Sequence, residues 1–299
     1  MVIIQAAGGL GNQLQQYALY RKFLSLGTEA RLDISWFTQE GKQDGVLAKR
    51  KLELSYLNGI SYIPAAEAEK KILTGGDGFG GKLRRKLLQG SVRRFRETQI
   101  YHPELLSFTD MYLEGYFACE KYYADILETM RKEISFPIED NPANKALSCE
   151  MESCQSVSVH VRRGDYLDRE NAAMFGGICT EDYYGGAIRW IKELCPQARF
   201  YIFSDDIAYV REHFQGEEYR VVDINHGKDS FLDIYLMSCC KHNICANSTF
   251  SFWGARLNGH EDKLMIRPTI HKNSQVFVKQ EMEELWKDWL FVDPEGLRR

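Results

Sequence analysis

The 299-residue sequence predicts an α/β fold made of two Rossmann-like domains, and three observations support this. An apolar strand over 2–6 precedes a glycine-rich turn and an amphipathic helix, and a second apolar strand follows at 30–34. The same order of elements returns in the second half. Residues 137–145 hold two prolines among Asp, Glu and Asn, a composition that favours turns and solvent. We therefore expect an N-terminal domain of residues 1–140 and a C-terminal domain of residues 141–299.

The first half is predicted to begin as strand, turn, helix and strand. The helix is expected from about Asn12, and Gly27 is expected to end it, because glycine readily adopts the left-handed backbone found at helix ends. Its apolar face is predicted from residues at helical spacing, which are Leu14, Tyr17, Ala18 and Leu24.

The second half is predicted to repeat this order. Val157, Val159 and Val161 alternate with other residues, which predicts a strand. Thr180, Glu181 and Asp182 are residues that favour the start of a helix. That helix is expected to carry Ile188, Ile191 and Leu194, and two further strands are expected over 200–203 and 243–246.

The composition is that of a globular protein with a sizeable core. Hydrophobic residues make up 44% of the chain, and 38 basic residues against 42 acidic ones give a net charge of −4. This balance disfavours nucleic acid as the main partner. The sequence shows neither a signal peptide nor a long apolar run, which predicts a cytoplasmic protein.

The cysteines are expected to be reduced and buried, because they are scattered and form no Cys-x-x-Cys pair. Four neighbouring residues could be drawn as a zinc cluster, but an amphipathic helix running into an apolar strand over 233–246 is the favoured interpretation. These four are Cys239, Cys240, His242 and Cys245.

Each strand predicted in the second half ends in a cluster of polar residues. The carboxyl ends of parallel strands lie along one edge of a sheet, where ligands bind, so we expect the clusters to form one site. They are His160, Arg162, Arg163 and Asp165 after the first strand, Ser204, Asp205 and Asp206 after the second, and Asn247, Ser248 and Thr249 after the third.

These groups suit a nucleotide diphosphate. Arginine presents a fork of donors to phosphate oxygens, and a helix beginning near Ser248 would offer its first N–H groups to an anion. Asp205 and Asp206 would repel phosphate and are expected to bind a purine edge or a ribose, with a helix N-cap as the alternative. Because no two aspartates are two positions apart, arginine is expected to replace the metal of Asp-x-Asp enzymes.

The N-terminal turn resembles part of the dinucleotide-binding fingerprint. Gly9 and Gly11 occupy its first two glycine positions and Asp33 has the spacing of its ribose-binding acid, but Leu14 stands where the third glycine belongs. A Rossmann-type NAD-dependent oxidoreductase is therefore one alternative function. A non-catalytic sugar-nucleotide-binding module is the other.

Three motifs in order resemble the bacterial α-1,2-fucosyltransferases of glycosyltransferase family 11. Residues 8–13, with Tyr17 and Ala18, look like the N-terminal motif of that family. Residues 160–166 look like its central motif, and residues 246–251 with 253–255 look like its third.

The resemblance implies a GT-B-like architecture, two Rossmann-like domains facing a cleft, with GDP-fucose held by the C-terminal domain and the acceptor contacted by the N-terminal one. It also implies inverting transfer of fucose to a hydroxyl of a β-galactoside, expected to be O2, with no cofactor and no metal. Arg162 would bind the diphosphate, while Asn12 would orient a sugar. The general base is left open between Asp33, Asp165 and His160.

Two sets of residues are therefore expected to form the site. The catalytic candidates are Arg162, His160, Asp165 and Asn12. The residues expected to bind GDP-fucose are Gly9, Gly11, Asn12, Gln13, His160, Arg162, Ser204, Asp205, Asp206, Asn247, Ser248, Thr249 and Phe250.

The segment Lys82–Arg96 is basic and contains no acidic residue. A solvated helix face is the favoured interpretation. The alternative is a peripheral contact with an anionic membrane or a lipid-linked acceptor at the inner face of the membrane.

Overall fold

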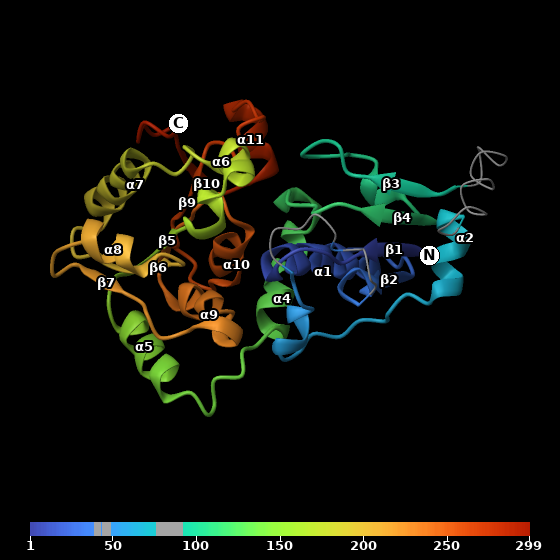
Figure 1. The fold of residues 1–299 in the computed structure, drawn as a ribbon, viewed down its shortest axis with the longest axis horizontal. Helices are drawn as coiled ribbons and strands as arrows, with labels where there is room; N and C mark the ends of the chain where they lie inside the picture. The colour runs from blue at the N-terminus through green and yellow to red at the C-terminus, as the bar shows by residue number, and fades with distance from the viewer. Residues whose placement is uncertain (39–42, 44–48, 76–91) are drawn as a thin grey trace. The chain divides into compact units, whose positions relative to one another are not determined.

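The computed structural model describes residues 1–38, 43, 49–75 and 92–299, and the chain divides into two compact units (Figure 1). The units are Met1–Ser135 and Phe136–Arg299, so the division lies just before the expected boundary at residue 140. Each unit contains one parallel sheet with helices packed on it. The predicted α/β class with two Rossmann-like domains is confirmed.

The first unit holds a four-stranded sheet in the order β2-β1-β4-β3. Its strands are β1 (Val2–Gln5), β2 (Ala30–Asp33), β3 (Arg94–Arg96) and β4 (Met111–Glu114). Its helices are α1 (Leu10–Ser25), α2 (Glu67–Thr74) and α4 (Leu127–Glu133). Short 3-10 helices lie at Ser35–Phe37, Glu53–Tyr56, Leu105–Ser107, Glu120–Tyr122 and Ala124–Ile126.

Helix α1 begins two residues earlier than the expected Asn12, directly after the glycine turn. It ends as predicted: Gly27 has φ +76° and its N–H donates to the carbonyl of Leu24. The helix is buried on almost every side, so the prediction of one apolar face understated its burial. Leu24, expected on that face, is instead 40% exposed because it lies in the last turn of the helix.

The second unit holds a six-stranded sheet in the order β10-β9-β8-β5-β6-β7. Its strands are β5 (Ser156–Val161), β6 (Arg199–Ser204), β7 (Tyr219–Val221), β8 (His242–Ile244), β9 (Met265–Pro268) and β10 (Trp289–Val292). Its helices are α5 (Pro142–Ser153), α6 (Arg169–Phe175), α7 (Glu181–Leu194), α8 (Ile207–His213), α9 (Leu232–Cys239), α10 (Thr249–Leu257) and α11 (Lys279–Leu285). Two 3-10 helices lie at Gly164–Leu167 and Gly227–Asp229.

Strand β5 forms the centre of the second unit and is buried at all of its positions. Its valines pack against α7 and α8 on one face, whereas α5, α9 and α10 pack together on the other face (Figure 1). The predicted strand is confirmed, but its non-valine positions are as buried as the valines. A strand in the middle of a parallel sheet is covered on both faces, so alternation here does not mark a solvent side.

The other predicted elements of the second half are confirmed, with one correction. Thr180 is the N-cap of α7, accepting a hydrogen bond from the N–H of Tyr183 at 3.0 Å. Ile188 and Ile191 are buried, as expected for the inward face, but Leu194 is 60% exposed at the end of the helix. The sheet, fully parallel, places the carboxyl ends of its strands along one edge.

Candidate active site

The loop after β5 and the loop after β6 meet through one carboxylate. Nη1 of Arg162 lies 2.8 Å from Oδ2 of Asp205, and both side chains are about one quarter exposed, at 25% and 27%. The other oxygen of Asp205 accepts hydrogen bonds from the N–H groups of Arg163 (2.9 Å) and Gly164 (3.1 Å). The first two predicted clusters therefore form one arrangement.

Arg163 is directed to a different partner from Arg162. Its Nε lies 3.1 Å from Oδ2 of Asp206, and its guanidinium stacks 3.6 Å from the ring centre of Tyr209. Asp206 also caps α8 by accepting a hydrogen bond from Tyr209 N–H, and this bond together with Arg163 lowers the pKa of Asp206. Ser204 donates to the carbonyl of Val161 at 2.7 Å, which ties the end of β6 to the end of β5.

The third cluster begins helix α10. Ser248 is its N-cap and its hydroxyl accepts from Phe250 N–H at 3.4 Å, as the sequence predicted. Ser248, Thr249 and Phe250 are half-buried. A helix start carries a partial positive charge and exposed N–H groups, so this region favours an anion.

Asn247, the residue before the N-cap of α10, is hydrogen-bonded to three neighbouring segments. Its Nδ2 donates to the carbonyls of Phe175 and His271, each at 3.1 Å, and its Oδ1 accepts from Cys179. These bonds are all internal to the unit. Asn247 thus supports the site from beneath, and its expected contact with GDP-fucose stays a prediction.

Tyr166 joins the third cluster to the first. Its hydroxyl donates to the carbonyl of Asn247 at 3.0 Å, and the guanidinium of Arg162 lies 5.6 Å from its ring centre. Reasoning from the sequence named this tyrosine only as part of a motif and gave it no role. The structure therefore brings all three predicted clusters together at one edge of the sheet.

His160 lies at the same edge and is buried. Its Nδ1 has no hydrogen-bond partner among the described residues, and its ring lies 5.8 Å from that of Phe250. Burial, followed by the positive charge of Arg162, lowers the pKa of His160 to about 4. The imidazole is therefore neutral near pH 7.

Helix α1 of the first unit starts beside a carboxylate rather than at an anion site. Glu53 accepts a hydrogen bond from the N–H of Leu10 at 3.0 Å, and burial raises the pKa of Glu53. A dinucleotide pyrophosphate would need these same first N–H groups. Gln13 is buried and bonded to the carbonyls of Gly8 and Lys51, so it holds the turn together.

Asp33 is 1% exposed and its carboxylate is fully engaged. It accepts from Tyr112 hydroxyl at 2.6 Å, from Ser35 N–H at 3.0 Å and from Lys70 at 3.2 Å. Burial alone would raise the pKa of Asp33, but these hydrogen bonds and the lysine charge lower it. Asp33 therefore presents no exposed carboxylate that could contact a ribose or act as the general base.

The remaining predicted residues have simple placements. Gly9 is the N-cap position of α1, Gly11 is buried in its first turn, and Asn12 is half-buried beside it. The side chain of Asp165 lies outside the described part of the structure, as do residues 82–91 of the basic segment.

The comparisons with known proteins give the chain a family. A model of the family described as glycosyl transferase family 11 matches residues 92–293, a range that includes all three strand ends. The chain belongs to glycosyltransferase family 11.

Two relatives and one solved structure illustrate the similarity. The chain is 32% identical over 276 residues to an Escherichia coli alpha-1,2-colitosyltransferase, covering 90% of this chain and 91% of that protein. It is 31% identical over 293 residues to the E. coli O-antigen biosynthesis glycosyltransferase WbnK, covering 88% and 92%. Fucosyltransferase NodZ from Bradyrhizobium matches with a TM-score of 0.45 and 16% identity, over 85% of this chain and 91% of that one.

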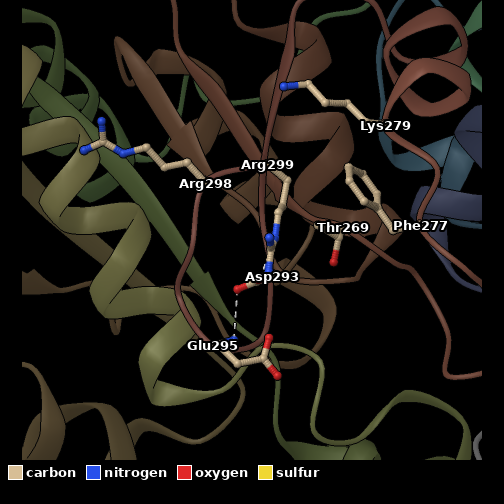
Figure 2. Close-up of a pocket in the computed structure, with 7 residues that line it drawn as sticks. All are labelled: Thr269, Phe277, Lys279, Asp293, Glu295, Arg298 and Arg299. Atoms are coloured by element: carbon tan, nitrogen blue, oxygen red, sulfur yellow. Dashed lines mark hydrogen bonds and ion pairs between the residues drawn. The ribbon is translucent and has the colours of Figure 1, made fainter.

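This family 11 glycosyltransferase also has a cavity of about 700 Å³ beyond the carboxyl ends of β9 and β10 (Figure 2). Arg299 points toward Asp293, with Nε 2.6 Å from Oδ2, and the N–H of Glu295 donates to the same carboxylate at 3.1 Å. None of the predicted site residues lines this cavity. The cavity and the predicted site chemistry therefore lie in different places. Among the lining charges, Asp293 pairs with Arg299, Arg298 pairs with Glu193 and Lys279 pairs with Glu283.

Among the described residues of this family 11 enzyme, no group of three or more His, Cys, Asp or Glu side chains is arranged to hold a metal ion. Cys245, one of the four residues of the zinc alternative, donates a hydrogen bond from its Sγ to the carbonyl of Ser251. No helix in the described ranges is long and apolar enough to span a membrane.

Proposed function

We propose that this family 11 enzyme transfers L-fucose from GDP-fucose to O2 of a β-galactoside, with inversion and without a metal. The observation that carries the proposal is that Tyr166 contacts both Arg162 and Asn247, the residue before the N-cap of α10, so that Arg162 and this helix start lie at one sheet edge. An arginine and a helix start together stabilise a diphosphate. Family membership supplies the reaction class.

In the proposed reaction, the acceptor oxygen attacks C1 of fucose on the face opposite GDP. The bond from C1 to the diphosphate oxygen breaks, and its electron pair remains on GDP. Arg162 and the first N–H groups of α10 stabilise that charge, an effect that reaches about 10²–10³ in rate for each donor. One displacement inverts the anomeric carbon.

The acceptor hydroxyl must also lose a proton. His160 is neutral at pH 7 and lies at the proposed site, but a pKa near 4 makes it a weak base. Asp165 follows the same strand and is the other candidate at this edge. Asp33 is disfavoured because its carboxylate is buried and bonded.

The donor sugar has one specific competitor. The E. coli relative that is 32% identical is named an alpha-1,2-colitosyltransferase, so colitose is a second candidate for the transferred sugar. The acceptor-side role of the N-terminal unit, including an orienting contact from Asn12, belongs to the same proposal.

A transfer assay tests the proposal directly. GDP-fucose and GDP-colitose would be offered in EDTA with a panel of β-galactosides, and the product linkage and anomeric configuration read by NMR. We expect fucose on O2 with inverted configuration. Colitose transfer in preference to fucose would replace the donor, and retention, attachment at another hydroxyl or donor binding without turnover across the panel would contradict the proposal.

A further inference from the structure

We propose that Asp205 is a positioning residue for the reaction: it fixes the guanidinium of Arg162 for the diphosphate and does not bind the nucleotide. This inference rests on the proposed function. It replaces the expected contact of Asp205 with a purine edge or a ribose. The geometry of one carboxylate, one guanidinium and two backbone N–H groups carries it.

The two oxygens of Asp205 have different partners. Oδ2 lies 2.8 Å from Nη1 of Arg162, a short charge-assisted contact. Oδ1 accepts from the N–H groups of Arg163 and Gly164, the two residues that follow Arg162. Asp205 therefore fixes both the arginine side chain and the backbone just beyond it.

Gly164 shows how closely the carboxylate fits. A Cβ added at this glycine would lie 2.9 Å from Cγ of Asp205 and nearer still to Oδ2. Any larger residue would therefore displace the carboxylate. The glycine is required here by close approach, because its φ is not in the left-handed region.

The surrounding contacts keep the Arg162–Asp205 ion pair separate from the neighbouring Arg163–Asp206 pair. Arg163 is held by Asp206 and the ring of Tyr209, so it does not compete for Asp205. Ser204, directly before Asp205, is hydrogen-bonded to the carbonyl directly before Arg162. The ends of β5 and β6 are thus fixed to each other at the position where the ion pair forms.

The charge of Asp205 argues for positioning over direct phosphate contact. A carboxylate repels a diphosphate, but one that orients an arginine lowers the entropic cost of ordering that flexible side chain when the ligand binds. A donor held in place before the reaction also acts more strongly on the charge that develops as the bond breaks.

A double-mutant cycle on GDP binding tests the inference. Asp205→Asn is expected to weaken GDP binding about tenfold in the wild-type protein and less than twofold in an Arg162→Ala background, because it acts through that arginine. Gly164→Ala is expected to give a similar loss that does not add to that of Asp205→Asn. With GDP-fucose, kcat should fall by about tenfold or more.

Asp223→Asn is the matched control, since Asp223 is 25% exposed and pairs with Arg211 elsewhere in the same unit. It should leave GDP binding unchanged. An equal loss in both arginine backgrounds would show direct ligand contact and overturn the inference, as would unchanged binding in both Asp205→Asn and Gly164→Ala. If Asp205→Asn does not fold, Gly164→Ala carries the same cycle. Wild-type protein that binds no GDP would overturn the proposed function, and this inference with it.

Discussion

The carboxyl edges of the two sheets differ in how their polar groups are used. At the first edge, Asp33 is held by Lys70, Tyr112 and Ser35, and the start of α1 is bonded to Glu53. At the second edge, the start of α10 is capped by the hydroxyl of Ser248, with Arg162 nearby. Similar strand and helix order therefore produces a helix start bonded to a carboxylate in one unit. In the other unit it produces a hydroxyl-capped helix start beside the partly exposed Arg162–Asp205 ion pair.

The difference teaches that a glycine-rich turn before a helix does not by itself make a phosphate site. The carboxylate of Glu53 occupies the position where the first N–H groups of α1 would meet a pyrophosphate. Glu53 lies about forty residues from the turn, so no local motif reveals it. The oxidoreductase alternative thus lacks both of its key groups, a helix start facing an anion and an exposed acid at Asp33.

The largest expected effect comes from the second edge. Arg162→Ala should lower fucose transfer by about 10²–10³-fold, because it removes a cation from the departing diphosphate. Circular dichroism and thermal unfolding should match the wild type. Arg211→Ala, which removes an exposed arginine from its ion pair with Asp223, should transfer fucose normally. Near-normal transfer by folded Arg162→Ala would contradict the comparison.

At the first edge, Asp33→Asn should act on stability. It removes the buried carboxylate that faces the ammonium of Lys70 and leaves that ammonium with Glu67 and Ser35, so we expect a loss of about 2–3 kcal/mol in the free energy of unfolding. Urea denaturation at pH 7 measures this. GDP affinity of the folded protein should be unchanged, and a large loss of affinity would show that the closed network takes part in donor binding.

The buried histidine predicts a pH dependence of stability. The pKa of His160 is lowered from 6.5 to about 4 in the folded state, so the unfolded chain binds more protons between these values. Stability should therefore fall as pH decreases from about 6.5 toward 4. Between pH 7 and pH 5, the free energy of unfolding should fall by about 2 kcal/mol less in His160→Gln than in the wild type. Urea denaturation at the two pH values measures this. An identical pH dependence in the two proteins would contradict a buried neutral imidazole.

The smallest expected effect is at the α10 cap. Ser248→Ala removes a hydroxyl that accepts from Phe250 N–H, which should cost about 1 kcal/mol of stability. GDP should bind a few times more weakly, because the first turn of the helix is less ordered. Ser248→Asp is the sharper comparison: it preserves a cap but adds negative charge, and should weaken GDP more than Ser248→Ala does. If Ser248→Ala weakened GDP binding more than Ser248→Asp does, the diphosphate would not bind at this helix start.

Local signals in the sequence predicted the elements and which polar clusters the strand ends bring together. Thr180 and Ser248 are caps whose partners lie within three residues, so the sequence could predict both. Arg162, Asp205 and Asn247 were grouped because strand ends in a parallel sheet share one edge. Leu24 and Leu194 were misplaced because periodicity does not show where a helix end leaves the core.

Contacts between distant residues could not be predicted in the same way. Asp33 meets Lys70 and Tyr112, and Gln13 meets Lys51, only after the chain has folded. The pairing of Arg162 with Asp205 was missed for the same reason, although both were named as site residues. Strand order and residue type thus predicted which polar clusters meet at one sheet edge, while the fold decides which neighbour each charge pairs with.

The most direct test of the central claim is a calorimetric titration of the wild-type protein with GDP in EDTA, with UDP and NAD as comparison ligands. GDP binding does not depend on knowing the acceptor. We predict selective binding of GDP that the Arg162→Ala variant loses in large part. Binding of NAD with no response to GDP would contradict the account and return the site to the first sheet edge, at Gly9, Gly11 and Asp33.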